Sequence, residues 1–233
     1  MPEDPKPLEF FQFPLPGVDI KHLQGKLIVV EGPDSVGRST QVQRLRAWLE
    51  QRGHAVVDTG MARSKLTQGG LKEAMNGHTL GPLTMALYYM ADFADRLENL
   101  VIPALRAGFV VITDRYFYSI VARAAARHQD ANWLVGVAGF ALVPHVTFYL
   151  RAPVREVVAR VVRGQSYFDY WESGMDVPYG RGLYQSFVGY QARLIELLDG
   201  LSDEYGFVTV DADRSPDEIF EELRRKTEPL LAP

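Results

Sequence analysis

The nine residues 32–40, Gly-Pro-Asp-Ser-Val-Gly-Arg-Ser-Thr, constrain the fold of this chain more than any other segment. They match the phosphate-binding pattern G-x-x-x-x-G-K-[ST], except that Arg38 takes the lysine position. The apolar run 27–30 before them has the length and β-branching of a buried parallel strand. Behind them, apolar residues recur at helical spacing from Val42 to Leu49. Strand, glycine loop and helix together predict a phosphate site at a helix N-terminus.

The loop residues are predicted to bind the phosphates of a nucleotide, because two glycines let backbone N–H groups converge on phosphate oxygens. The predicted set is Gly32, Pro33, Asp34, Ser35, Val36, Gly37, Arg38, Ser39 and Thr40. The Ser39 hydroxyl is placed to bind magnesium. Arg38 is longer than lysine and is a planar fork with five donors, so it can bind phosphate bidentately. The substitution therefore preserves phosphate binding but leaves open whether the chemistry is altered.

Composition sets outer limits on function. The 233 residues are enough for one α/β domain with a large core, and a net charge of −4 carries no basic footprint for nucleic acid. The absence of cysteine excludes disulfides and thiolate-bound metals. No apolar run approaches the roughly 18 residues of a membrane span, and the N-terminus lacks the features of a secretory signal. We expect a cytoplasmic protein without nucleic-acid or membrane partners.

Residues 1–24 read as an arm ahead of a single domain at 25–233. Five prolines prevent a helix in this arm, namely Pro2, Pro5, Pro7, Pro14 and Pro16. Phe10, Phe11 and Phe13 are too apolar for a free tail, so we expect the arm to pack on the domain or on a partner chain.

Strands and helices alternate through the rest of the chain. Strands are predicted at 27–30, 55–59, 109–113, 145–150 and 207–210. After the loop helix, further helices are predicted at 66–76, 82–107 with a bend at Pro103, 116–127, 132–140, 154–162, 183–201 and 216–231. This alternation predicts a doubly wound α/β fold, a mostly parallel sheet with helices on both faces. Ligands then bind at the C-terminal ends of the strands, where the phosphate loop lies.

A second group of polar residues, Asp114-Arg115-Tyr116, follows the strand 109–113 and therefore reaches the same edge. Asp114 is predicted to join the magnesium shell, and Arg115 to clamp a phosphate in a bidentate fork. The alternative is a salt bridge that caps the next helix. Beside a phosphate loop on a parallel sheet, we favour the functional interpretation.

Three further arginines have open alternatives. Arg96 follows aromatic residues on the helix 82–107, where it faces either a nucleotide base or a surface ion pair. Arg163 and Arg181 flank the glycine- and aromatic-rich segment 164–182, which we predict to be a mobile lid. The alternative for both is that they complement helix dipoles. The spacing of the five histidines is not that of metal ligands; they are His22, His54, His78, His128 and His145.

From about Gly25 to Leu231, the sequence resembles the thymidylate kinase family. Residues 31–41 are similar to the family's E-G-x-D-x-x-G-K-S-T-Q, and Asp34 is the most discriminating of them. Residues 93–96 resemble the F-A-A-D-R helix, with the phenylalanine one residue closer to the arginine. The other similar positions are Asp114-Arg115-Tyr116 with Ser119 (D-R-Y-x-x-S), the strand 144–150 with His145 in place of aspartate, Arg163-Gly164, Glu172 and Tyr190.

The resemblance implies a five-stranded parallel sheet of the P-loop kinase type, a homodimer, and transfer of the ATP γ-phosphoryl group to thymidine monophosphate with Mg²⁺. It implies that Asp34 contacts the acceptor, that Arg115 holds the acceptor phosphate and that Arg96 contacts thymine. Phe93 and Ser119 would line the same acceptor site. With Arg38 at the phosphates, Asp34 and Arg115 would complete the catalytic group.

The sequence departs from the family at three places. Arg38 replaces lysine, and residues 58–63 lack the acceptor-clamping arginine of T-R-E-P-G-G-T, for which Arg63 is a candidate substitute. In the lid, Tyr170 stands where the family's D-R-x-E has arginine. Three hypotheses follow: a working nucleoside monophosphate kinase, foremost for thymidylate; a degenerate kinase that binds nucleotides in a regulatory or interaction role; and a kinase for another acceptor.

Overall fold

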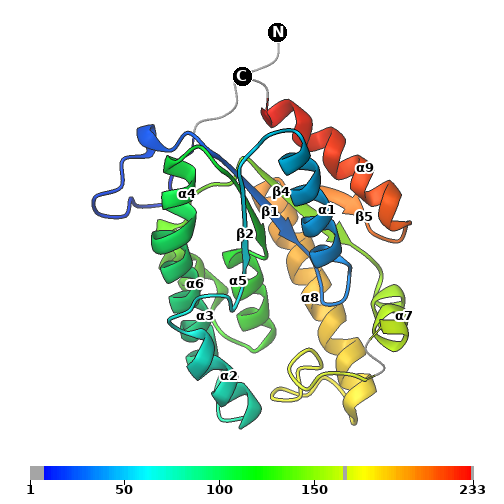
Figure 1. Ribbon diagram of the computed structural model, residues 1–233. Coiled ribbons are helices and arrows are strands. Elements are labelled where there is room, and N and C mark those ends of the chain that lie inside the picture. Colours follow the sequence, from blue (N-terminus) through cyan, green and yellow to red (C-terminus); the bar gives the residue numbers. More distant parts are fainter. Residues whose placement is uncertain (1–7, 165–166, 232–233) are drawn as a thin grey trace.

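A five-stranded parallel sheet forms the centre of the protein, in a computed structural model that describes residues 8–164 and 167–231 (Figure 1). The strand order is β2-β3-β1-β4-β5, and every described strand pair is parallel. The strands are β1 (Lys26–Glu31), β2 (Val56–Gly60), β3 (Val110–Asp114), β4 (Val146–Arg151) and β5 (Val208–Asp211). The predicted doubly wound α/β fold is confirmed.

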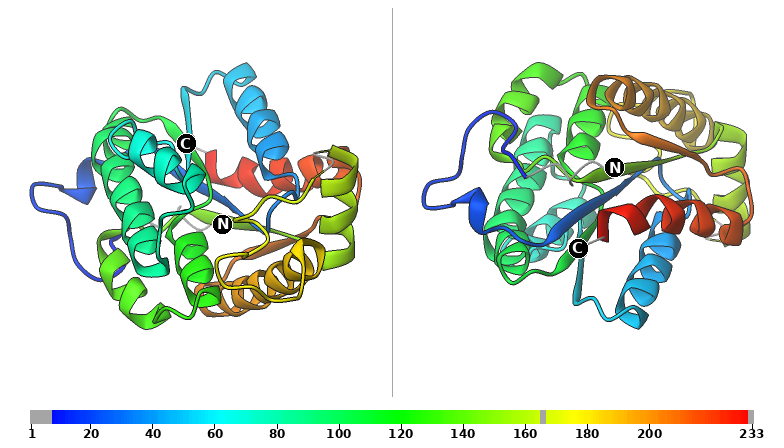
Figure 2. Two further views of the ribbon diagram at one scale, coloured as in Figure 1. Left: turned by 90° about the horizontal axis from the view of Figure 1, so that it is seen from below. Right: turned by 90° about the horizontal axis from the view of Figure 1, so that it is seen from above.

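Helices cover both faces of this sheet (Figures 1 and 2). The α-helices are α1 (Arg38–Gln51), α2 (Gln68–Asn76), α3 (Pro82–Arg96), α4 (Ile102–Arg106), α5 (Phe117–Ala126), α6 (Ala131–Val137), α7 (Val154–Gly164), α8 (Leu183–Tyr205) and α9 (Pro216–Thr227). Short 3-10 turns occupy η1 (Ile20–His22), η3 (Ala138–Phe140) and η4 (Glu228–Leu231). Helices α3, α5 and α8 contribute to one core and α1, α7 and α9 to the other.

The side chains of β1 alternate between the two faces of the sheet, which explains why there are two cores. Leu27 and Val29 point to the α3/α5/α8 side, whereas Ile28 and Val30 point to the α1/α9 side. Successive side chains of a strand leave opposite faces of the sheet, so a strand that is apolar at every position must be covered twice.

The helix predicted as one element at 82–107 is divided. Helix α3 ends at Arg96, a π-helical turn (η2, Leu97–Val101) follows, and α4 continues to Arg106. Pro103 was the predicted bend, and the distortion lies one turn earlier. Proline has no N–H, and its ring clashes with the carbonyl four residues before it, here that of Asn99 inside the π turn.

The described part of the N-terminal arm packs on the domain of its own chain. Phe10 forms an antiparallel bridge with Leu142, and the Phe11 ring lies 4.9 Å from that of Phe117. Pro2, Pro5 and Pro7 lie outside the described residues. No described helix is both long and apolar enough to cross a membrane.

Candidate functional site

The phosphate loop turns tightly between β1 and α1 because glycine occupies two positions that other residues do not fit. Gly32 has φ +152°, and a Cβ there would lie 2.7 Å from the carbonyl oxygen of Leu150. Gly37 caps α1 in the left-handed region at φ +98°. The loop therefore ends at the N-terminus of α1, at the same end of the sheet as α2 and the segment 167–182 (Figure 1).

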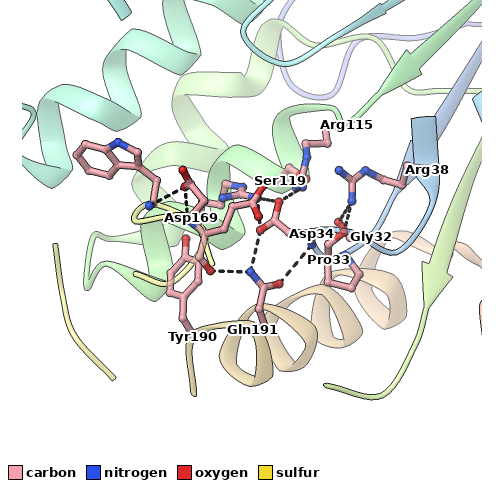
Figure 3. A network of polar contacts seen from close by, with 12 residues as sticks. Gly32, Pro33, Asp34, Arg38, Arg115, Ser119, Asp169, Tyr190 and Gln191 are labelled. Atoms are coloured by element: carbon pink, nitrogen blue, oxygen red, sulfur yellow. Dashed lines mark hydrogen bonds and ion pairs between the residues drawn. The ribbon is translucent and has the colours of Figure 1, made fainter. Parts of the chain in front are cut away.

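Arg38 is folded back onto the loop. Its Nε donates to Oδ1 of Asp114 at 2.8 Å. Its Nη1 donates to the carbonyl oxygens of Gly32, at 2.8 Å, and of Pro33 (Figure 3). The side chain is only 10% exposed. The guanidinium that replaces the loop lysine is thus held by the loop and by the end of β3.

Two oxygen atoms at this edge suit a magnesium ion. Ser39 Oγ donates to Oδ2 of Asp114 at 2.9 Å, which places a hydroxyl and a carboxylate side by side. Mg²⁺ prefers such oxygen ligands and usually takes one or two from the protein, with water and substrate phosphates completing its shell. Among the described residues, no cluster of three His, Cys, Asp or Glu side chains could hold a metal. Ser39 and Asp114 therefore fit the donor set that Mg²⁺ takes from a protein.

Asp34 lies at the centre of a buried polar cluster, between Arg115 and Gln191 (Figure 3). Arg115 Nη2 donates to Oδ1 at 2.5 Å, and Arg123 Nη2 donates to Oδ1 at 2.5 Å and to Oδ2 at 2.7 Å. On the other side, Gln191 Nε2 donates to Oδ2 at 2.8 Å. Asp34 is thus bound to α5 and α8 in addition to its own loop.

Arg115 adopts an unusual backbone conformation that directs it into this cluster. Its φ is +72°, in the left-handed region that non-glycine residues seldom occupy. Its Nη1 donates to Ser119 Oγ at 3.2 Å, and that hydroxyl donates to Glu31 Oε2 at 2.6 Å. Glu31 Oε1 also accepts the N–H of Tyr116 at 2.8 Å. The end of β1 therefore orients the start of α5.

Charges in the cluster shift one another's pKa values. Burial alone would raise the pKa of Asp34, but Arg123 and Arg115 outweigh it and hold that pKa below its ordinary value. Burial, together with the neighbouring charges of Arg38 and Arg123, lowers the pKa of Arg115 to about 10. For Glu172, burial and the charge of Asp34 raise the pKa to about 7. Asp34 is consequently ionised near neutral pH, while Glu172 is close to its titration midpoint.

The segment 167–182, predicted as part of a lid at 164–182, contains no helix or strand before α8. It is fastened by Arg127, which pairs with Asp176 at 2.7 Å and donates to the carbonyl oxygen of Trp171 at 3.2 Å. The Trp171 indole N–H donates to the carbonyl oxygen of Met75 at 3.2 Å, at the end of α2. This segment is therefore bonded to the ends of α5 and α2, and the carbonyl oxygen of its Glu172 accepts Nε2 of Gln191, the partner of Asp34. Residues 165 and 166 lie outside the described part.

Two cavities are large enough to matter for ligand binding, and one of them is lined by the loop. One of about 340 Å³ lies beside Gly37 and Thr40 and is also lined by Arg160, Arg163 and Arg214. The other, of about 420 Å³, lies between α2 and the segment 167–182, lined by Ala62, Leu71, Met75, Tyr170 and Trp171 among others. Each is large enough for a nucleoside-sized ligand.

Several predicted residues lie together and others do not. Asp34, Arg38 and Asp114 lie in one connected network with Arg115, Ser119 and Ser39. Arg163 lines the 340 Å³ cavity, paired with Glu156, whereas Arg181 is exposed.

The predicted acceptor residues on α3 are placed differently. Phe93 is 1% exposed and packs in the core against Tyr116, and its place in the acceptor site stays a prediction. Its shift by one residue turns the ring about 100° around the helix. Arg96 pairs with Asp92 at 2.8 Å and lines a separate cavity of about 590 Å³.

Four residues of the site were missed from the sequence. Arg123 and Arg127 follow Arg115 at intervals of eight and twelve residues, a helical spacing that could have indicated them. Arg160 donates to the carbonyl oxygen of Val36 at 2.6 Å and so supports the loop. For Gln191, on a helix far along the chain, the sequence carries no such signal.

Comparison with known proteins agrees with this geometry. The family model of thymidylate kinase matches residues 30–223. The chain is 32% identical to a probable thymidylate kinase 2 of Saccharolobus solfataricus over 204 residues, 87% of this chain and 95% of the relative. It is 34% identical to a thymidylate kinase of Clavibacter michiganensis subsp. michiganensis over 217 residues, 90% of this chain and 98% of the relative. A probable thymidylate kinase of Thermococcus kodakarensis is 38% identical over 143 residues, 58% of this chain and 70% of that relative.

Proposed function

The chain belongs to the thymidylate kinase family, and from that premise we propose that it transfers the γ-phosphoryl group of ATP to a nucleoside 5′-monophosphate, foremost thymidine 5′-monophosphate. An acceptor phosphate oxygen attacks the γ-phosphorus, the bond from the γ-phosphorus to the β–γ bridging oxygen breaks, and ADP leaves. The observation that carries this proposal is that the phosphate loop is bonded to both Asp114 and Arg115 at the end of β3. Asp114 connects through Arg38 to the phosphate loop, and the loop's Asp34 binds Arg115.

In this proposal the donor nucleotide lies on the loop. Its phosphates accept backbone N–H groups of the loop 32–40, where Pro33 offers none, and its base enters the 340 Å³ cavity beside Thr40 and Arg160. Ser39 and Asp114 would hold Mg²⁺, which neutralises charge on the phosphates. Arg38 supplies positive charge to the transferring group, because phosphoryl transfer depends mainly on positioning and charge stabilisation.

The acceptor would lie across the cluster from the donor. Its phosphate is held by Arg115, with Ser119 and Glu31 orienting that arginine, and Asp34 contacts the phosphate or the sugar. The 420 Å³ cavity, with Tyr170 and Trp171 in its wall, is the space offered to the base. Residues 164–182 serve as the lid over both ligands in this proposal.

A coupled ADP-release assay across nucleosides and nucleoside monophosphates tests the function. We expect turnover with thymidine 5′-monophosphate and none with thymidine. Turnover on a different acceptor would select the third hypothesis. Tight ATP binding without turnover on any acceptor would select the nucleotide-binding alternative, a regulatory or interaction role.

Two wider proposals accompany this one. We propose a homodimer through α3, supported by Leu83 and Leu87, which lie one turn apart and are 50% and 45% exposed. Sedimentation of Leu87→Glu against the wild type tests it, and a monomeric wild type would contradict it.

We also propose that the protein acts in the cytoplasm, where ATP and nucleotide acceptors are available. Fractionation of cells that express the protein tests that location.

A further inference from the structure

Three arginines and a serine lie on or beside α5 at every fourth position of the sequence. Arg115 precedes the helix, Ser119 and Arg123 lie on it, and Arg127 follows its last residue. Arg127 uses its donors on Asp176, Trp171 and the Tyr190 hydroxyl. Its guanidinium donors are therefore taken up by protein groups, and Arg127 fastens the segment 167–182 to the end of α5.

Arg123 differs from Arg127 in what it binds. Its Nη2 donates to both carboxylate oxygens of Asp34, and among the described residues Asp34 is the only hydrogen-bond partner of its guanidinium. Its Nε is buried and has no partner at all. A buried donor without an acceptor costs free energy, so this N–H is available to an oxygen of a ligand.

The charges around Asp34 favour an anion. Three guanidinium groups, those of Arg38, Arg115 and Arg123, converge on the carboxylates of Asp34 and Asp114. Burial raises the pKa values of two nearby carboxyl groups, Glu31 and Glu172. The ion pairs with Asp34 and Asp114 contain three guanidinium groups and two carboxylates, so one positive charge is left over for a ligand phosphate.

We propose that Arg123 binds the phosphate of the acceptor together with Arg115, and that Asp34 occupies both guanidinium groups in the free protein. The ligand class is a nucleoside 5′-monophosphate, so this inference rests on the proposed function. Arg123 would take over the role of the clamping arginine that residues 58–63 lack. Arg63, the candidate from the sequence, is instead 44% exposed and pairs with Asp58 at 3.2 Å.

The test measures how much the phosphate adds to binding. Calorimetry gives the ratio of the dissociation constants of thymidine and thymidine 5′-monophosphate for the wild type, Arg123→Met and Arg123→Lys. Losing a charge-assisted hydrogen bond should lower this ratio by about ten- to a hundred-fold in Arg123→Met. Arg123→Lys keeps the charge and should recover part of the ratio, while ATP affinity stays as in the wild type.

Gln191→Met is the matched control for a positioning role. It removes a hydrogen bond to Asp34 without removing charge, so it should weaken both ligands alike and leave their ratio intact. If the Arg123→Met ratio equals that of the wild type, Arg123 only positions Asp34 and the inference is overturned. Should Arg123→Met fail to fold, Arg123→Gln, which retains polarity, provides the same comparison.

A panel of nucleosides and their monophosphates separates this inference from the proposed function. If thymidine 5′-monophosphate is not the acceptor, the ratio is measured with the monophosphate that binds, and an unchanged ratio in Arg123→Met still counts against Arg123. Binding of no monophosphate by the wild type overturns both proposals.

Discussion

Arg38 donates its Nε–H to Oδ1 of Asp114 across 2.8 Å, and this ion pair joins the phosphate loop to the end of β3. The other oxygen of Asp114 accepts the hydroxyl of Ser39 at 2.9 Å. One carboxylate thus holds both the arginine that replaces the loop lysine and the serine proposed to bind magnesium. In the proposed function, Mg²⁺ at Asp114 would compete with Arg38 for this carboxylate, which would release the guanidinium toward the phosphates.

Replacement of Arg38 tests its role in transfer. We expect Arg38→Ala to lower kcat by at least about a hundred-fold, as loss of a charge-stabilising donor does. Arg38→Lys should not exceed the wild type, because the loop carbonyl groups and Asp114 are arranged around the guanidinium group. Arg193→Ala, which removes an arginine from a surface pair with Glu196, is the charge control and should retain kcat.

Two results of that assay would contradict this role for Arg38. A measurable wild-type kcat that Arg38→Ala leaves unchanged removes Arg38 from the chemistry. A wild type that is inactive on every acceptor and gains activity in Arg38→Lys identifies a degenerate kinase.

Ser39→Ala should weaken ATP binding and reduce its magnesium dependence, because the substitution deletes one of the two oxygen ligands beside the loop. Calorimetry with and without Mg²⁺ measures both effects. Unchanged affinity with unchanged magnesium dependence would place the nucleotide site elsewhere.

For Arg115→Ala, we expect the acceptor KM to rise about ten- to a hundred-fold, since a charge-assisted hydrogen bond to phosphate contributes about 1.5–3 kcal/mol. The affinity for ATP should stay nearly constant. A fall in ATP affinity instead would assign Arg115 to the donor side.

Glu172 should make stability depend on pH. Its pKa is raised from 4.5 to about 7 in the folded protein, mainly by burial, so the folded state binds its proton more tightly than the unfolded state does. The free energy of unfolding should therefore decrease as the pH rises from 4.5 to 7, by about 1–3 kcal/mol relative to Glu172→Gln. Urea unfolding of both proteins at pH 5 and pH 8 measures this difference, and parallel pH profiles would refute it.

His145 should have the opposite effect at lower pH. Burial and the nearby charge of Lys26 lower its pKa from 6.5 to about 4. Its Nδ1 accepts the N–H of Leu27 at 3.0 Å, an acceptor that protonation of Nδ1 would remove. Stability should fall as the pH decreases from 6.5 to 4, and His145→Asn, which keeps an acceptor, should flatten that fall. Thermal unfolding at pH 4.5 and 7 compares the two, and an equal fall in both proteins would count against His145.

Local patterns were enough to predict the fold and the position of the phosphate loop. The glycines 32 and 37, the apolar strand before them and the helix after them are all local in sequence, and alternation of strands and helices leads to a parallel sheet. The same reasoning placed Asp114 and Arg115 at the loop's edge, because parallel strands end together. It did not reveal that Phe93 is buried in the core, since a shift of one residue on a helix changes the face and only packing shows which face is core.

The partners of Asp34 were decided by tertiary structure alone. Gln191 lies 157 residues away, and it meets Asp34 because α8 packs against α5 beside the loop. Arg123 reaches the same carboxylate only because the end of β1 holds the start of α5 through Glu31 and Ser119. Periodicity and spacing specify which segments become helices or strands, since these depend on neighbouring residues. Which charges then share one carboxylate depends on how those elements pack, and contacts between distant segments leave no periodic mark in a single sequence.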